Sequence, residues 1–343
     1  MCGVRHESGP NGALIEPHSL ERIDLLIGLT IAAVTLGCQL AGGLRALWAL
    51  VGLVISTLFA IGVQVDVGTF ISNTTAMAGP TARGMAILET TLSSYVIYAL
   101  AFRWVLRPAI SYLQQHRAIK VFDKRLGLVF GPLIGTLICS IAVAIAVRFP
   151  IGVDVRSEIE TSRLGSSLVT LAYTLQPALR GFTPSSDAQP LFKTDVVTRS
   201  RPSNLDVPAD LSVMLDPKAE ATLLGLINHA RLTEGLPALT LDARAADVAR
   251  RHSAEMFRLR YFGHVSPRSG SAVDRLRADG IRLARSAEAL ALAPLSLAAH
   301  LGLMHNAVDR ANLLDPTFAR VGIGVVAAEP YGLMVTEVFL QGP

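Results

Sequence analysis

The sequence predicts a membrane bundle of four transmembrane α-helices followed by a soluble α+β domain. Hydrophobic residues fill 51% of the 343 positions and charged residues only 17%, whereas an ordinary soluble domain carries about 25% charged residues. The apolar excess lies before Val147, and the chain from Asp216 onward has a mixed composition. This change predicts a membrane domain at 1–148, a linker at 149–215 and a soluble domain at 216–343.

Four segments are apolar enough to cross a membrane, which requires about 20 residues of helix. They are Ile23–Ala41, Ala46–Val63, Met85–Val105 and Leu126–Val147. No small-residue cleavage site of the signal-peptide kind follows the first segment, so we expect a retained helix. Asp24 and Glu89 lie within these segments, and we expect both carboxylates at the membrane interface rather than in a proton path.

The basic residues predict the orientation of the bundle, because Lys and Arg in short loops favour the cytoplasm. Between the third and fourth segments stand Arg103, Arg107, Arg117, Lys120, Lys124 and Arg125, with Asp123 as the acidic residue. The loop between the second and third segments holds only Asp66 and Arg83. We therefore expect the basic loop inside the cell, and both termini and the soluble domain outside the cytoplasm.

Three glycines in the last apolar segment, Gly127, Gly131 and Gly135, are spaced one helical turn apart. A face of such small residues lets a second helix approach closely. We therefore expect the last helix to pack through this face against another helix of the bundle.

The approach to the last segment, Phe122–Gly131, and the opening of the first, Ile23-Asp24-Leu25, form a sequence pattern. This pattern resembles the colicin V production protein family. The resemblance covers the membrane part of the chain and implies a four-helix membrane domain linked to export or toxin production.

The linker at 149–215 contains clusters of Ser, Pro and Gly, which are typical of loops. Within it, Ser157–Leu179 predicts a short amphipathic helix on or near the membrane. We expect the rest of the linker to be an extended tether.

Capping residues and apolar spacing predict the elements of the soluble domain. Asp216-Pro217 opens a first helix, Asp242 caps a second, and Ser296–Leu303 predicts a further helix. Two apolar runs, Val321–Val326 and Leu333–Phe339, predict strands joined by a turn. The domain contains no cysteine, so it must fold without disulfides.

The charge of the soluble domain argues against a nucleic-acid partner. From Asp216 to Pro343 there are 14 Lys and Arg against 13 Asp and Glu. The sequence also lacks the basic stripe interleaved with aromatics that a nucleic-acid surface requires. We therefore expect no nucleic acid among its partners.

Seven stretches of the soluble domain follow one another in the order and spacing of a known family. They are Leu226–Arg231, Gly235–Leu239, Ala249–Ser253, Phe262–Pro267, Arg310–Pro316, Val321–Val325 and Val335–Phe339. This pattern resembles the CAP superfamily of cysteine-rich secretory, antigen and pathogenesis-related proteins, also called SCP, in its disulfide-free bacterial form. The resemblance implies an α-β-α sandwich with a cleft of two histidines and acidic residues, which binds a divalent metal in some members.

By motif position, the resemblance implies that His264 is the first cleft histidine and that Glu288 is the acidic residue. Asp309 occupies the position of the second histidine, and His305 lies four residues earlier, on the same face if the helix continues. These residues could hold a divalent metal such as zinc at His264 and Glu288, but one imidazole with two carboxylates is a harder ligand set. Asp309 would also be a poorer general base than a histidine near pH 7.

The other histidines are expected to be structural or solvated. His252 lies on the inward pattern of its helix, and we expect His300, like His305, to be solvated rather than a ligand. The sequence contains no Gly-x-Ser-x-Gly elbow, His-Glu-x-x-His helix, P-loop or dinucleotide fingerprint. The sequence motifs alone therefore identify no catalytic side chain.

Three hypotheses for function follow. The first is a membrane-anchored envelope protein whose domain outside the cytoplasm binds a lipid, glycan or protein. The second is a metal-assisted envelope hydrolase that uses His264 and Glu288. The third places the function in the membrane domain, in export, with the soluble domain as its sensor.

Overall fold

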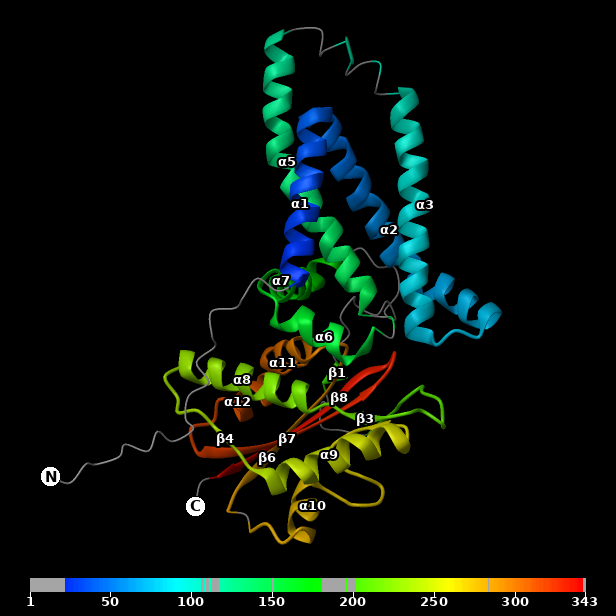
Figure 1. Cartoon of the computed structure of the whole chain (residues 1–343). Coiled ribbons are helices and arrows are strands. Elements are labelled where there is room, and N and C mark those ends of the chain that lie inside the picture. Colours follow the sequence, from blue (N-terminus) through cyan, green and yellow to red (C-terminus); the bar gives the residue numbers. More distant parts are fainter. Residues whose placement is uncertain are drawn as a thin grey trace, which may run out of the picture.

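The computed structural model describes residues 22–105, 108, 111–112, 117–147, 149, 151–180, 195–196, 202–282 and 284–341. Four long helices come first: α1 (Arg22–Ala41), α2 (Gly43–Thr75), α3 (Gly79–Val105) and α5 (Arg117–Ala146). All four are long and apolar enough to cross a membrane, and they form a bundle above the C-terminal domain (Figure 1). The four predicted helices are therefore confirmed, although α2 continues past Val63 until Ala76 adopts a left-handed backbone conformation.

The close approach predicted for the glycine face of α5 is confirmed, and its partner is α1. A Cβ on Gly127 would lie 2.5 Å from the carbonyl oxygen of Cys38, and one on Gly131 would lie 2.5 Å from the Cα of Thr35. A larger residue at either position would push the two helices apart. The glycines therefore set the distance between α1 and α5.

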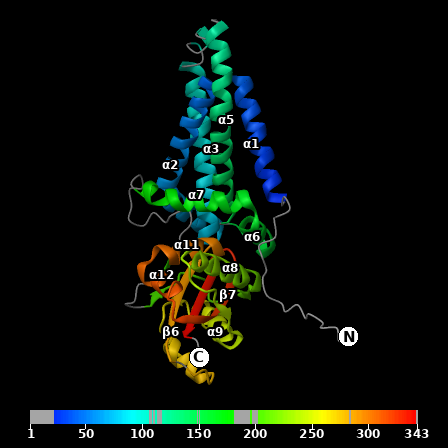
Figure 2. The ribbon, with the colours of Figure 1, turned by 90° about the vertical axis from the view of Figure 1, so that its left-hand side faces the viewer.

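Two helices, α6 (Gly152–Thr161) and α7 (Arg163–Arg180), follow the bundle. Figures 1 and 2 both show α7 crossing the end of the bundle that faces the C-terminal domain. The single helix predicted at Ser157–Leu179 is thus two helices, which are separated at Ser162.

Asp24 lies at the junction between α1 and α7. It was expected at the membrane interface, and it is found at the end of the bundle but only 4% exposed. Its carboxylate accepts hydrogen bonds from the Ser162 hydroxyl at 2.9 Å and from the backbone N–H of Leu164 at 2.7 Å. Asp24 therefore caps α7 and joins it to α1. Glu89, the other acidic residue, is exposed on α3.

The C-terminal domain is a mostly antiparallel sheet with helices on both faces. Its helices are α8 (Pro217–Thr233), α9 (Ala243–Arg258), α10 (Ala272–Ala278), α11 (Ser296–His305) and α12 (Ala307–Leu313). Its strands are β1 (Asp195–Val196), β2 (Ser203–Asn204), β3 (Met214–Leu215), β4 (Thr240–Leu241), β5 (Tyr261–Phe262), β6 (Ser286–Ala293), β7 (Phe318–Ala328) and β8 (Gly332–Gln341). The main sheet has the order β1-β6-β8-β7-β3, with β4 pairing in parallel to β7, and β2 pairs with β5 in a second sheet.

Side chains that alternate along β8 divide the domain into two layers. Phe339 packs with Leu223 of α8 in one layer, which also includes residues of α11 and α12. Met334 packs with Met256 of α9 on the opposite face. The predicted α-β-α sandwich is therefore confirmed, together with the predicted hairpin of β7 and β8.

The predicted helix caps are also confirmed. The Asp216 carboxylate accepts the backbone N–H of Ala219 at 3.0 Å, and the Asp242 carboxylate accepts that of Ala245 at 3.0 Å. Each cap satisfies a backbone donor that a helix leaves free at its start.

Three short strands come from the segment that was expected to be an extended tether. β1 pairs with β6, β2 with β5, and β3 with β7. These pairs satisfy backbone groups of the linker and extend the sheet of the domain. The prediction of an extended tether is therefore wrong for these segments, because they are strands paired with the C-terminal domain.

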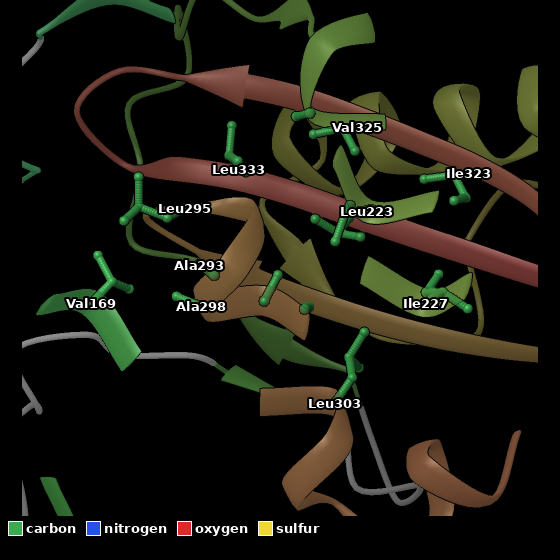
Figure 3. Close-up of a cluster of buried hydrophobic side chains, with 14 of the residues drawn as sticks. Val169, Leu223, Ile227, Ala293, Leu295, Ala298, Leu303, Ile323, Val325 and Leu333 are labelled. Atoms are coloured by element: carbon green, nitrogen blue, oxygen red, sulfur yellow. The ribbon is translucent and has the colours of Figure 1, made fainter. Parts of the chain in front are cut away.

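The C-terminal domain packs directly against α6 and α7. Figure 3 shows Val169 of α7 beside Leu295 and Ala298, and all three are buried in one apolar cluster. Glu160 of α6 accepts the backbone N–H of Leu297 at 3.1 Å, at the start of α11. Burial raises the pKa of Glu160 to about 7. Apolar contact and a capping carboxylate thus hold the domain against the end of the bundle.

Candidate functional site

His264 and Glu288 meet on the face of the sheet covered by α9 and α10. His264 lies in the loop between β5 and α10, whereas Glu288 lies on β6. Nδ1 of His264 is 2.9 Å from Oε2 of Glu288, and the other carboxylate oxygen accepts a hydrogen bond from Arg275 of α10. Figures 1 and 2 show α9 and α10 at the end of the molecule remote from the helical bundle.

Arg275 connects Glu288 to the loop that carries His264. Its guanidinium is buried and also donates to the carbonyl oxygens of His264 at 3.2 Å and Gly270 at 2.7 Å. One side chain therefore fixes the carboxylate of Glu288 and the main chain of the loop. The sequence did not predict a role for Arg275, because nothing in the local pattern separates it from Arg277, which is exposed on the same helix.

The loop that carries His264 is closed by its own hydrogen bonds. The hydroxyl of Ser266 donates to Glu255 of α9 at 2.6 Å, and it accepts the backbone N–H groups of Arg268 and Ser269 at 2.9 and 2.8 Å. Ser266 and Gly270 also exchange backbone hydrogen bonds at 2.9 and 3.2 Å. These contacts give His264 a fixed position above the sheet.

His252 supports the loop from the interior. It is fully buried, and its Nε2 lies 3.2 Å from the carbonyl oxygen of Gly263. Burial lowers the pKa of His252 to about 4, so the ring is neutral at pH 7. The structural role predicted for His252 is confirmed.

The electrostatics of the pair leave one imidazole nitrogen available. Burial opposes ionisation of Glu288, but the hydrogen bond from His264 and the charge of Arg275 outweigh it, so the pKa of Glu288 lies below its ordinary value. An ionised carboxylate accepts the Nδ1–H of His264, which leaves Nε2 with its lone pair. The His264 side chain is 27% exposed, and Nε2 has no hydrogen-bond partner among the described residues.

Asp309 does not join this pair. Along β6 and β8, Glu288 is paired with Val338, so the neighbouring Glu337 points to the opposite face of the sheet. Glu337 is fully buried there, and burial, with a smaller effect of Asp309, raises its pKa to about 8. Asp309 therefore lies with Glu337 on the face covered by α8, α11 and α12, away from His264.

His305 and His300 lie on α11 and face different surroundings. His305 is the last residue of the helix, and Asn306 interrupts the continuation that would have placed it on one face with Asp309. His305 is exposed, as expected, with its ring 5.3 Å from that of Tyr173 in α7. The expectation that His300 is solvated is wrong, because the residue is only 7% exposed and burial lowers its pKa to about 4.

The residues present do not fit a divalent metal. Both oxygens of Glu288 and Nδ1 of His264 are already engaged, and a zinc site needs about three or four protein ligands. Across the described ranges, no group of three or more His, Cys, Asp or Glu side chains could hold a metal ion. The arrangement can instead accept or donate one hydrogen bond through Nε2 of His264.

Residues 224–339 match the model of the CAP family, described as the cysteine-rich secretory protein family. The C-terminal region is a CAP domain. The matched range includes His264, Arg275 and Glu288, so the whole candidate site belongs to the CAP domain.

Two curated relatives come from Bacillus subtilis (strain 168). The uncharacterized membrane protein YlbC is 33% identical over 108 residues, which are 31% of this chain and 31% of that protein. The uncharacterized protein YkwD is 30% identical over 122 residues, 35% of this chain and 46% of that protein. The chain thus spans less than half the length of either relative.

Two solved structures resemble the chain in part. An extracellular SCP-domain protein from Bacillus anthracis is 30% identical with a TM-score of 0.35, and the match covers 37% of this chain and 41% of that chain. An outer surface protein from Borrelia burgdorferi is 13% identical with a TM-score of 0.37, over 39% and 99% of the two chains. The assignment of the CAP domain rests on the family model rather than on these overlaps.

Proposed function

We propose that this protein is anchored in a membrane by α1, α2, α3 and α5 and presents its CAP domain outside the cytoplasm to bind a ligand at His264. The observation that carries the proposal is the fixed imidazole of His264. Glu288 and Arg275 are buried beside it, and the Glu288 carboxylate, which Arg275 also contacts, is bonded to Nδ1, while Nε2 has no hydrogen-bond partner among the described residues. Such a preorganised polar group contributes to binding without the cost of ordering it first.

The ends of the bundle support this orientation. The helices that flank the basic loop, α3 and α5, meet it at the end remote from the CAP domain (Figure 1). Near that end Asp123, the acidic residue of the basic loop, accepts the backbone N–H of Leu44 at 2.7 Å. If the basic loop is cytoplasmic, the CAP domain lies on the other side of the membrane.

Binding fits the site better than the alternative of a metal-assisted hydrolase. That reaction would need Glu288 as a metal ligand, but both of its oxygens already accept hydrogen bonds. The nearest hydroxyl in the sequence, Ser266, is buried and donates to Glu255, so it is not poised as a nucleophile. The proposed ligand is an envelope component such as a glycan, lipid or protein.

A role of the membrane helices in export, which the resemblance to the colicin V production family implies, stays a prediction. The contact that would link the two halves is the packing of α11 against α6 and α7. A ligand that shifts α11 would therefore also displace α7. Because Asp24 of α1 accepts a hydrogen bond from the start of α7, the displacement would reach α1.

Site-specific photo-crosslinking in cells that produce the full chain tests the binding proposal. A benzophenone amino acid at Val265, which is 57% exposed beside His264, should give an ultraviolet-dependent adduct. The matched control position is Val308, which is 46% exposed but lies on α12 in the opposite layer. We expect an adduct at Val265 that is lost with His264→Ala, and none at Val308.

Equal adducts at both positions would reflect random contact and would contradict the proposal. An adduct at Val265 that persists in His264→Ala would show that the imidazole does not contribute to binding. No adduct at Val265 in cells that grow under several conditions would also contradict a ligand at this site.

A further inference from the structure

The charges of the CAP domain are segregated, although their sum is nearly zero. Residues 244–285 contain ten arginines and four acidic residues. The rest of 216–343 contains four basic and nine acidic residues. The basic stretch comprises α9, the His264 loop and α10, which form the layer remote from the helical bundle (Figures 1 and 2). The net charge of the CAP domain is therefore close to zero, although its layer remote from the bundle is basic.

Half of these arginines have a partner within the protein. Arg250 pairs with Glu220, Arg251 with Asp279, Arg275 with Glu288, and Arg285 with Asp315. Arg244 donates to the carbonyl oxygen of Asp279. These five arginines therefore serve to stabilise the fold through contacts within the protein.

The other five arginines are exposed and free. They are Arg258, Arg260, Arg268, Arg277 and Arg282. None of the five has an ion pair or a side-chain hydrogen bond within the part of the chain that the structure describes. They lie at the end of α9, in the His264 loop, on α10 and just after it, so they flank the candidate site along the chain on both sides.

The arrangement of the five free arginines indicates that the ligand is an anion. A single free arginine is ordinary, but five in one layer raise the local positive potential and attract anions. The guanidinium group presents a planar fork of donors that matches phosphate and carboxylate oxygens. His264 lies between these arginines along the chain, in the loop that joins β5 to α10.

We propose that the α9–α10 layer around His264 binds a phosphate-bearing polyanion. This inference rests on the proposed function and specifies the chemistry of its ligand. The ligand would span several arginines at once, because separate weak contacts add when they are held on one chain. Its source would be a polymer of the envelope rather than the anchoring bilayer, since the layer lies at the end remote from α1, α2, α3 and α5 (Figure 1).

The test measures binding of dye-labelled inorganic polyphosphate to the full chain in nanodiscs of zwitterionic lipid, by fluorescence anisotropy. The test variant is Arg258→Gln/Arg268→Gln/Arg282→Gln, which removes free arginines. The matched control is Arg251→Gln/Arg285→Gln/Arg310→Gln, which changes the charge equally but removes arginines paired with Asp279, Asp315 and Glu234. We expect the test variant to bind at least about tenfold more weakly, with the control within about threefold of wild type.

Equal losses in the two variants would mean that only net charge matters and would overturn the inference. Equal binding of polyglutamate at the same charge would overturn the preference for phosphate. No binding of polyphosphate by the wild type would also overturn it, while an adduct at Val265 in cells would still support a ligand of other chemistry. Thermal unfolding of each variant verifies that the comparison is made between folded proteins.

Discussion

The carboxylate of Asp24 accepts the backbone N–H of Leu164 at 2.7 Å, which joins the first long helix to a helix 140 residues further along the chain. Acidic groups are favourable at helix N-termini, where they satisfy free N–H donors and the helix dipole. Through this contact the bundle defines where α7 begins, and α7 in turn packs against α11 of the CAP domain. The CAP domain is thus docked on the bundle rather than suspended from it.

Replacing Asp24 tests that docking. Asp24→Ala should lower the stability of the full chain by about 1–2 kcal/mol, because the start of α7 loses its cap. The measurement is thermal unfolding in detergent, with Glu89→Ala as the control, since Glu89 is exposed on α3. A loss as large in the control would show that Asp24 has no special role.

The isolated CAP domain should fold without any oxidant, because it contains no cysteine. A fragment that begins at residue 202 should be more stable than one that begins at 210, by about 1–2 kcal/mol, since only the longer one keeps β2 paired with β5. Denaturant unfolding of both fragments measures the difference. Equal stability would mean that β2 adds nothing to the domain.

The pH dependence of stability should reveal Glu337. Its pKa is about 8 in the folded protein against 4.5 as the ordinary value, so the folded state binds a proton that the unfolded state releases between these values. Its contribution to the free energy of unfolding therefore falls as the pH rises from 4.5 through 8. Glu337→Gln should stabilise the domain at pH 8 by about 1–3 kcal/mol and change little at pH 5.

The matched control for this pH series is Glu234→Gln, which removes an exposed carboxylate paired with Arg310. Its unfolding curve should shift equally little at both pH values. A Glu337→Gln variant whose difference from wild type does not depend on pH would show that Glu337 ionises normally.

Breaking the buried pair at the candidate site should be costly. Glu288→Gln leaves Arg275 charged and buried without its carboxylate, so the free energy of unfolding should fall by about 3 kcal/mol. Asp247→Asn, which removes an exposed partner of Arg250, should change it by less than about 1 kcal/mol. Equal effects in denaturant unfolding would mean that the buried pair does not hold the loop.

The sequence predicted the elements with strong local signals. The four apolar helices, the caps Asp216 and Asp242 and the β7–β8 hairpin were all found. Strand β6 was missed, because Ser286–Ala293 is rich in alanine and has little strand propensity of its own. Pairing with β8 along its whole length makes it a strand.

The candidate site was predicted only in part. The meeting of His264 with Glu288 followed from family motifs, whereas the separation of Asp309 depends on the face to which each residue points. A motif gives the order of residues but not the pleat of β8 or the break at Asn306. The contribution of Arg275 depends on long-range contacts that no local pattern encodes.

Cysteine labelling in intact cells decides whether the bundle holds the His264 site outside the cytoplasm. The full chain is first changed so that serine replaces its native cysteines. Val265→Cys is then introduced, and its labelling by a membrane-impermeant maleimide is measured. Tyr112→Cys, in the segment between α3 and α5, serves as the control. Both side chains are exposed, at 57% and 68%. We predict labelling of Val265→Cys in intact cells and of Tyr112→Cys only after permeabilisation. The reverse pattern would place the CAP domain in the cytoplasm and contradict the proposed function.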